Sequence, residues 1–132
     1  MEQVYIARRA HFSAAHRLYN PEFSEQQNWD TFGACNNPKG HGHNYTIEVW
    51  LRGPIDPQTG YVFDLTRLKQ IVDAEIVQQV DHRHLNDVQG LEHATCECMC
   101  GWIWHWLQDR GQKATVIIVR ETPSARCIYY GE

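Results

Sequence analysis

The fold of this chain is decided by one stretch, Gly40-His41-Gly42-His43-Asn44-Tyr45-Thr46-Ile47-Glu48-Val49-Trp50-Leu51-Arg52. From residue 44 onward, apolar side chains alternate with a second row made of polar side chains and one tryptophan. Successive side chains of a strand project to opposite faces, so the alternation predicts a strand over 44–52. The glycine-histidine run leads directly into this strand.

The flanking segments complete an α+β domain. Alternation predicts a first strand over 4–12, and apolar spacing of three and four residues predicts helices over about 64–80 and 96–110. Asp64 and Thr95 are the expected N-caps. Two final strands are expected over 114–120 and 126–130, and a long irregular segment over 18–40. The order β-β-α-α-β-β predicts a four-stranded, mainly antiparallel sheet with two helices on one face.

Length and composition predict a single domain over residues 1–132. The net charge of −4 argues against general binding to nucleic acid or to a membrane surface. No apolar run approaches the ~18–20 residues of a membrane-spanning helix. With no export signal and an odd count of 5 cysteines, we expect a cytoplasmic protein with reduced thiols.

Three histidines form a candidate metal site. His41 and His43 alternate along a strand and can therefore point to one side, and flanking glycines would leave room around an ion. His16, at the end of the first strand, is the expected third ligand, and His11 is a rival for that role. Three imidazoles with a vacant fourth position are typical of catalytic zinc. The alternative is a pair of ordinary loop histidines.

Two further groups are candidates for proton transfer. Cys35 lies six residues before His41, and a nearby cation would favour its thiolate. The alternative is a small apolar side chain in a loop. In Asp81-His82, a carboxylate can orient an imidazole, although basic residues also suit a helix C-terminus.

Other motifs are interpreted as structural. On a helix, Cys96 and Cys100 share a face while Cys98 points away, so these three thiols cannot converge on one ion. A redox sensor built on them is a weaker hypothesis. The tryptophans at 102, 104 and 106 are expected to pack. Glu121 is either an exposed charge or a carboxylate that accepts from a polar ring.

Taken together, these residues resemble the family of 6-pyruvoyltetrahydropterin synthases and bacterial 6-carboxytetrahydropterin synthases. The resemblance covers essentially the whole chain. It is carried by Phe12-Ser13-Ala14-Ala15-His16-Arg17-Leu18, the run from Cys35 to Tyr45, Asp81-His82 with Leu85-Asn86, Thr95-Cys96-Glu97, Glu121-Thr122 and the closing Gly131-Glu132.

The resemblance implies a catalytic site for a pterin. Zinc would be held by His16, His41 and His43. The proton-transfer group would be Cys35, Asp81 and His82, and the pterin would meet Glu121, Thr95 and Glu97. The implied substrate is 7,8-dihydroneopterin triphosphate. Separately from the resemblance, Arg17 and Lys39 are candidates for contacts with the triphosphate. The implied tunnelling fold forms trimers that stack as a hexamer, with active sites between subunits.

The resemblance leaves the product open. The principal hypothesis is a zinc-dependent lyase that makes 6-pyruvoyltetrahydropterin and releases triphosphate. The alternative is 6-carboxy-5,6,7,8-tetrahydropterin synthase of queuosine biosynthesis, which uses the same substrate and also releases acetaldehyde. The spacing from Cys35 to His41 favours the first branch, and Asp64 with the ending Cys127-Ile128-Tyr129-Tyr130-Gly131-Glu132 favours the second. A non-catalytic module that binds metal or pterin is a further hypothesis.

Overall fold

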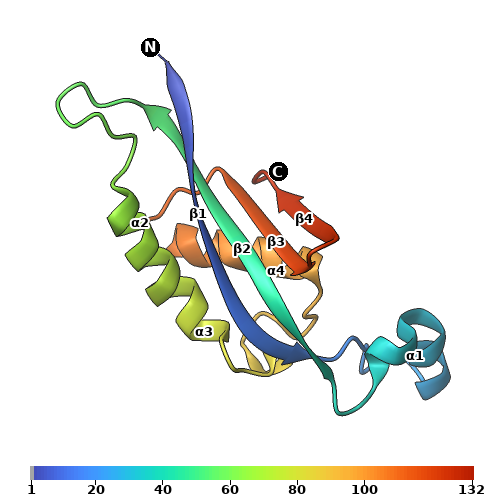
Figure 1. Ribbon diagram of the computed structural model, residues 1–132. Coiled ribbons are helices and arrows are strands. Elements are labelled where there is room, and N and C mark those ends of the chain that lie inside the picture. The colour runs from blue at the N-terminus through green and yellow to red at the C-terminus, as the bar shows by residue number, and fades with distance from the viewer. Residues whose placement is uncertain (1) are drawn as a thin grey trace.

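A single antiparallel sheet organises the chain in the computed structural model, which describes residues 2–132. The strands lie in the order β1-β2-β3-β4 (Figure 1), with bounds Gln3–His16, His41–Pro54, Val116–Thr122 and Ala125–Tyr129. Two helical segments pack on one face of the sheet: α4 over Cys96–Asp109, and a continuous helix made of α2, η2 and α3. The predicted α+β class, with a four-stranded antiparallel sheet and two helices on one face, is confirmed.

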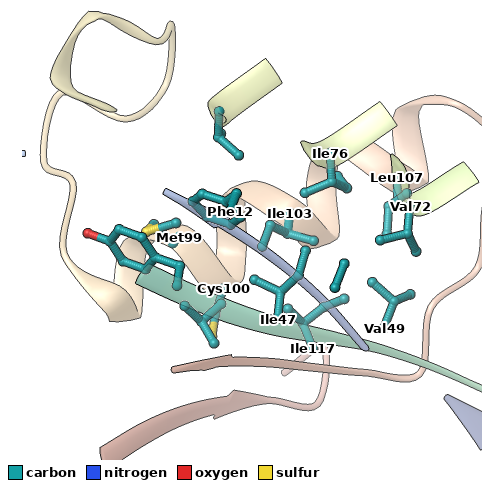
Figure 2. Close-up of a cluster of buried hydrophobic side chains, with 14 of the residues drawn as sticks. Phe12, Ile47, Val49, Val72, Ile76, Met99, Cys100, Ile103, Leu107 and Ile117 are labelled. Atoms are coloured by element: carbon teal, nitrogen blue, oxygen red, sulfur yellow. The ribbon is translucent and has the colours of Figure 1, made fainter. Parts of the chain in front are cut away.

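The long hairpin of β1 and β2 sets the register of the molecule. Phe12 is opposite Tyr45 and His16 is opposite His41. From Ala10 onward, buried residues recur at every second position of β1 until the row ends at His16. Each large apolar side chain buried on this face contributes about 1.5–3 kcal/mol. Figure 2 shows this core, with strand residues packed against helical ones: Phe12, Ile47, Val49 and Ile117 against Val72, Ile76, Met99, Ile103 and Leu107.

The helix predicted over 64–80 is present, with a local distortion. It runs as α2 (Leu65–Ile71), a π-helical stretch η2 (Val72–Val77) and α3 (Gln78–Val80), and the Asp64 side chain accepts from the Thr66 amide as its cap. The π-helical stretch adds a residue per turn without disturbing the apolar spacing enough to be visible in the sequence. The second predicted helix, α4, is capped by Thr95 as expected.

The prediction of an irregular segment over 18–40 is wrong in its middle. α1 spans Glu25–Phe32 and a 3₁₀ turn, η1, spans Gly33–Asn36. Ser24 and Gln27 form a reciprocal capping box that starts α1. The helix is largely polar and buries only Asn28, so it has no apolar periodicity to reveal it. A second 3₁₀ turn, η3, spans Leu85–Asp87.

The strand boundaries also differ from the prediction. β1 and β2 run farther than expected at the end where they meet α1, so all three candidate metal ligands lie on strands. β3 and β4 fall within two residues of their predicted ranges. In residues 2–132, none of the helices combines the length and apolar character required to cross a bilayer.

Candidate metal centre

Three imidazoles converge where the buried row of the sheet ends. One ring nitrogen from each of His16, His41 and His43 lies within 4.8 Å of the others. The Nε2 atoms of His16 and His41 are 3.0 Å apart. Strand pairing explains the convergence, because His16 is opposite His41 and His43 lies two residues along the same face. The rival ligand His11 is exposed and belongs to the opposite face of β1.

The surroundings of His16 favour the tautomer in which Nδ1 carries the proton and Nε2 carries none. The ring is fully buried, and Nδ1 donates to the Ala94 carbonyl at 2.7 Å. Burial lowers the pKa of His16, and burial likewise lowers the pKa of His41. A neutral imidazole whose Nδ1 carries the proton presents a lone pair on Nε2, the form that a metal requires.

The donor set fits a divalent cation. Within the described residues, the buried Nε2 of His43 has no hydrogen-bond partner, and such an atom is costly to bury unless an ion or water meets it. Three neutral imidazoles aimed at one point are typical zinc ligands. His16, His41 and His43 could therefore hold a metal.

Gly40 is required for this arrangement. Its φ of +74° lies in the left-handed region, and a Cβ there would come within 2.8 Å of the His16 carbonyl oxygen. Gly42 is different, because a Cβ there would make an ordinary 3.6 Å contact with the Ala14 carbonyl. We expected both glycines to leave room for an ion. Instead, Gly40 is needed for its left-handed backbone conformation and its close approach to the His16 carbonyl, and Gly42 has no such requirement.

Cys35 shares a hollow with two of the histidines. A cavity of about 330 Å³ is lined by residues that include Cys35, His41, His43 and Glu121. Cys35 lies in η1, and its carbonyl accepts from the Leu18 amide at 2.9 Å. The predicted neighbourhood of Cys35 and the histidines is therefore present within one chain.

Asp81 and His82 form the expected pair but lie elsewhere. Asp81 accepts from the Ser13 amide at 3.0 Å, which holds the pKa of this carboxyl below its usual range, and its other oxygen lies 3.0 Å from His82 Nδ1. His82 adopts a left-handed φ of +59° and is largely exposed. Cys35 and His82 line different hollows, although His43 borders both.

The start of α4 lies beside the metal centre. Thr95 caps the helix by accepting from the Cys98 amide, and the preceding residue, Ala94, fixes His16. Glu97 is exposed in the first turn, where its Oε1 lies 3.6 Å from Cys127 Sγ. Sequence reasoning missed Ala94, because a carbonyl carries no sequence signal. It also missed Tyr45, whose hydroxyl lies 3.2 Å from His16 Nδ1, because an aromatic residue in a buried row is typical of a core.

Two basic candidates lie on either side of Cys35 in the sequence. The Nε of Arg17 donates to the Asn36 carbonyl, and Lys39 is exposed. Cys98 is exposed while Cys96 and Cys100 face β3 and β4, so the prediction that these thiols diverge is confirmed. Burial raises the pKa of the Cys96 and Cys100 thiols, which makes them poor nucleophiles.

The fold and the site together define a class: a small α+β domain in which three strand histidines converge beside a cysteine. A family model described as 6-pyruvoyl tetrahydropterin synthase matches residues 5–132. The human 6-pyruvoyl tetrahydrobiopterin synthase is 40% identical over 135 residues, covering 98% of this chain and 93% of the relative. The Drosophila melanogaster protein of that name is 38% identical over 134 residues, covering 97% of this chain and 80% of the relative.

A solved structure agrees with these relatives. The Caenorhabditis elegans 6-pyruvoyl tetrahydropterin synthase superimposes with a TM-score of 0.91 at 35% identity, covering 100% of this chain and 98% of that one. The chain belongs to the 6-pyruvoyl tetrahydropterin synthase family, a family of lyases.

Proposed function

We propose that this chain converts 7,8-dihydroneopterin triphosphate to 6-pyruvoyltetrahydropterin and releases triphosphate. The observation that carries the proposal is the single hollow shared by Cys35, His41 and His43, because it joins a proton acceptor to a candidate metal centre. The names of the relatives support the pyruvoyl product over the carboxy product.

The metal is proposed to be zinc, held by His16, His41 and His43. Bound there, zinc would supply Lewis-acid chemistry, making protons on and beside the substrate's side-chain hydroxyls more acidic. Cys35 Sγ, as the thiolate, accepts a proton from a side-chain carbon, and the resulting thiol returns a proton during the internal redox rearrangement. Glu121, Thr95 and Glu97 are proposed to contact the pterin, since a carboxylate can accept two parallel N–H groups from its aminopyrimidine edge.

Asp81 and His82 are proposed to act on a neighbouring subunit's substrate. Asp81 accepts from His82 Nδ1, which leaves His82 Nε2 at the exposed end of the side chain to exchange a proton. Since Cys35 and His82 line different hollows of one chain, their cooperation requires a second copy, as the expected hexamer would provide.

The reaction is tested by anaerobic incubation with 7,8-dihydroneopterin triphosphate followed by mass spectrometry. The pyruvoyl product with free triphosphate supports the proposal. A carboxy product with acetaldehyde would reassign the chain to the other branch, and no reaction would favour a non-catalytic module. Cys35→Ala should retain metal and lose turnover, whereas His43→Ala should lose the metal.

The intersubunit arrangement has its own test. Cys35→Ala and His82→Ala, each expected to be inactive alone, are unfolded, mixed and refolded together. Random assembly should restore roughly a quarter of wild-type activity, because that fraction of interfaces pairs an intact Cys35 with an intact His82. Mixed oligomers that remain inactive would refute the shared site.

A further inference from the structure

Glu121 is aimed into the metal centre by the irregular end of β3. Pairing with β2 continues to Arg120, opposite Thr46, so Glu121 follows Ile117 and Val119 on the buried face. On the other side, the register between β3 and β4 shifts between Val119 and Thr122. Such irregularities re-aim side chains and recur beside active sites. The same face of the sheet thus supplies Glu121 and all three histidines.

The contacts of Glu121 bring acceptor atoms together. Its Oε1 lies 3.0 Å from His16 Nε2 and 3.5 Å from His43 Nε2. A carboxylate oxygen accepts hydrogen bonds, and in the neutral tautomer that donates from Nδ1 to Ala94, His16 Nε2 carries a lone pair as well. Acceptors this close need a cation or a proton between them, and the directions of the lone pairs suit a shared cation.

The spacing also suits ligation. With zinc bonds of about 2.0–2.1 Å, the corners of a tetrahedron lie roughly 3.3 Å apart. The distances of 3.0 and 3.5 Å from the carboxylate oxygen to the two nitrogens bracket that value. The Glu121 side chain is 31% exposed, and it lines the hollow it shares with Cys35. It can therefore move aside when another ligand enters.

We propose that Glu121 is a fourth metal ligand in the substrate-free protein, completing the three-histidine set. The proposal rests on the proposed function only in requiring a divalent cation at the three histidines. An entering substrate hydroxyl must then displace the carboxylate. Displacement would free Glu121 to contact the pterin. A coordination position on the metal would then become available only when the substrate enters.

Metal affinity, measured without substrate, tests this role. Apo-protein is titrated with Co²⁺ in competition with a chromogenic chelator, and the visible absorption of bound Co²⁺ reports its coordination. Glu121→Gln should bind Co²⁺ at least about 10-fold more weakly and give a different spectrum, since loss of even an outer partner of a metal site typically costs that much. Glu121→Asp keeps the charge but shortens the reach, so it should also be weakened.

Glu97→Gln is the matched control, because it removes a carboxylate from the first turn of α4, where Glu97 lies beside Cys127. Its Co²⁺ affinity and spectrum should equal those of the wild type. Wild-type affinity and spectrum in both Glu121 variants would overturn the fourth-ligand proposal and leave the three-histidine site intact. If wild-type protein takes up no stoichiometric Co²⁺, or His43→Ala binds it equally well, the metal in the proposed function fails as well.

Discussion

Arg17 fastens the turn that carries Cys35, and we predict that its loss slows catalysis without weakening substrate binding. Its Nε donates to the Asn36 carbonyl at 2.8 Å and its Nη2 to Asn36 Oδ1 at 3.0 Å. Asn36 is only 3% exposed. The guanidinium also lies 4.1 Å from the centre of the Tyr19 ring. These contacts occupy the group that could otherwise meet a triphosphate.

The expected magnitude follows from these two hydrogen bonds. A hydrogen bond from a charged donor contributes about 1.5–3 kcal/mol, and water replaces part of that at a half-buried side chain. The buried Asn36 acceptors would also lose their partner. For Arg17→Gln we expect the free energy of unfolding to fall by about 1.5–3 kcal/mol. Displacement of Cys35 by a fraction of an ångström or more should lower kcat roughly 10- to 100-fold.

Arg17→Lys is the informative comparison. Lysine keeps the charge but cannot reproduce the two-pronged contact with Asn36. Both variants should therefore lose kcat with little change in KM, and the alkylation rate of Cys35 by iodoacetamide, followed by mass spectrometry, should change in both. A raised KM in Arg17→Gln alone, with Arg17→Lys and Cys35 reactivity unaffected, would refute the reasoning and restore Arg17 as a triphosphate contact.

The remaining predictions concern the metal centre and the thiols. Tyr45→Phe removes the hydroxyl 3.2 Å from His16 Nδ1 and should weaken metal affinity about 10-fold, measured by chelator competition, with about 1 kcal/mol lost in stability. Burial lowers the pKa of His16 and His41, so the unfolded chain binds more protons than the folded chain as the solution becomes acidic. The metal-free protein should therefore lose stability as the pH falls below about 6.5 and regain it when the pH is raised again, as measured by thermal unfolding across pH. Cys100→Ser should lower the free energy of unfolding by about 1–3 kcal/mol, because it buries a hydroxyl. Cys98 is exposed, so Cys98→Ser should keep the wild-type free energy of unfolding and the wild-type turnover. A large loss of turnover in Cys98→Ser would support the redox-sensor hypothesis instead.

The fold was predictable wherever one periodicity repeats along an element. Alternation over residues 44–52 and helical spacing over 64–80 reflect burial on one face, so both elements are present as predicted. α1 was not predictable in this way, because its stability comes from the capping box of Ser24 and Gln27 rather than from an apolar stripe. The strand ends were missed because histidine and glycine interrupt the apolar alternation while the backbone pairing continues.

The histidines of the candidate site were predictable from the sequence, but the groups that orient them were not. Alternation alone places His41 and His43 on one side, and antiparallel pairing supplies His16. The Ala94 carbonyl that orients His16 comes from a loop 78 residues away in sequence, and only the packed structure brings it there. The approach of Glu121 to His16 depends on a strand irregularity that leaves no pattern in the sequence.

The site divides into a rigid part and a lightly anchored part, and the division follows from the fold. The metal ligands extend the buried row of a hairpin that is paired from Gln3 to His16, so their positions are fixed by the longest pairing in the sheet. Cys35 comes from η1, beyond the end of the hairpin where α1 lies (Figure 1). Its carbonyl is held by the Leu18 amide, and the next residue is held by Arg17. Metal ligands and proton-transfer groups must both be held close to their productive geometry, but Cys35 depends for this on a few hydrogen bonds rather than on strand pairing. The proton-transfer group is therefore where substitutions in the supporting residues should change kcat most while leaving metal affinity intact.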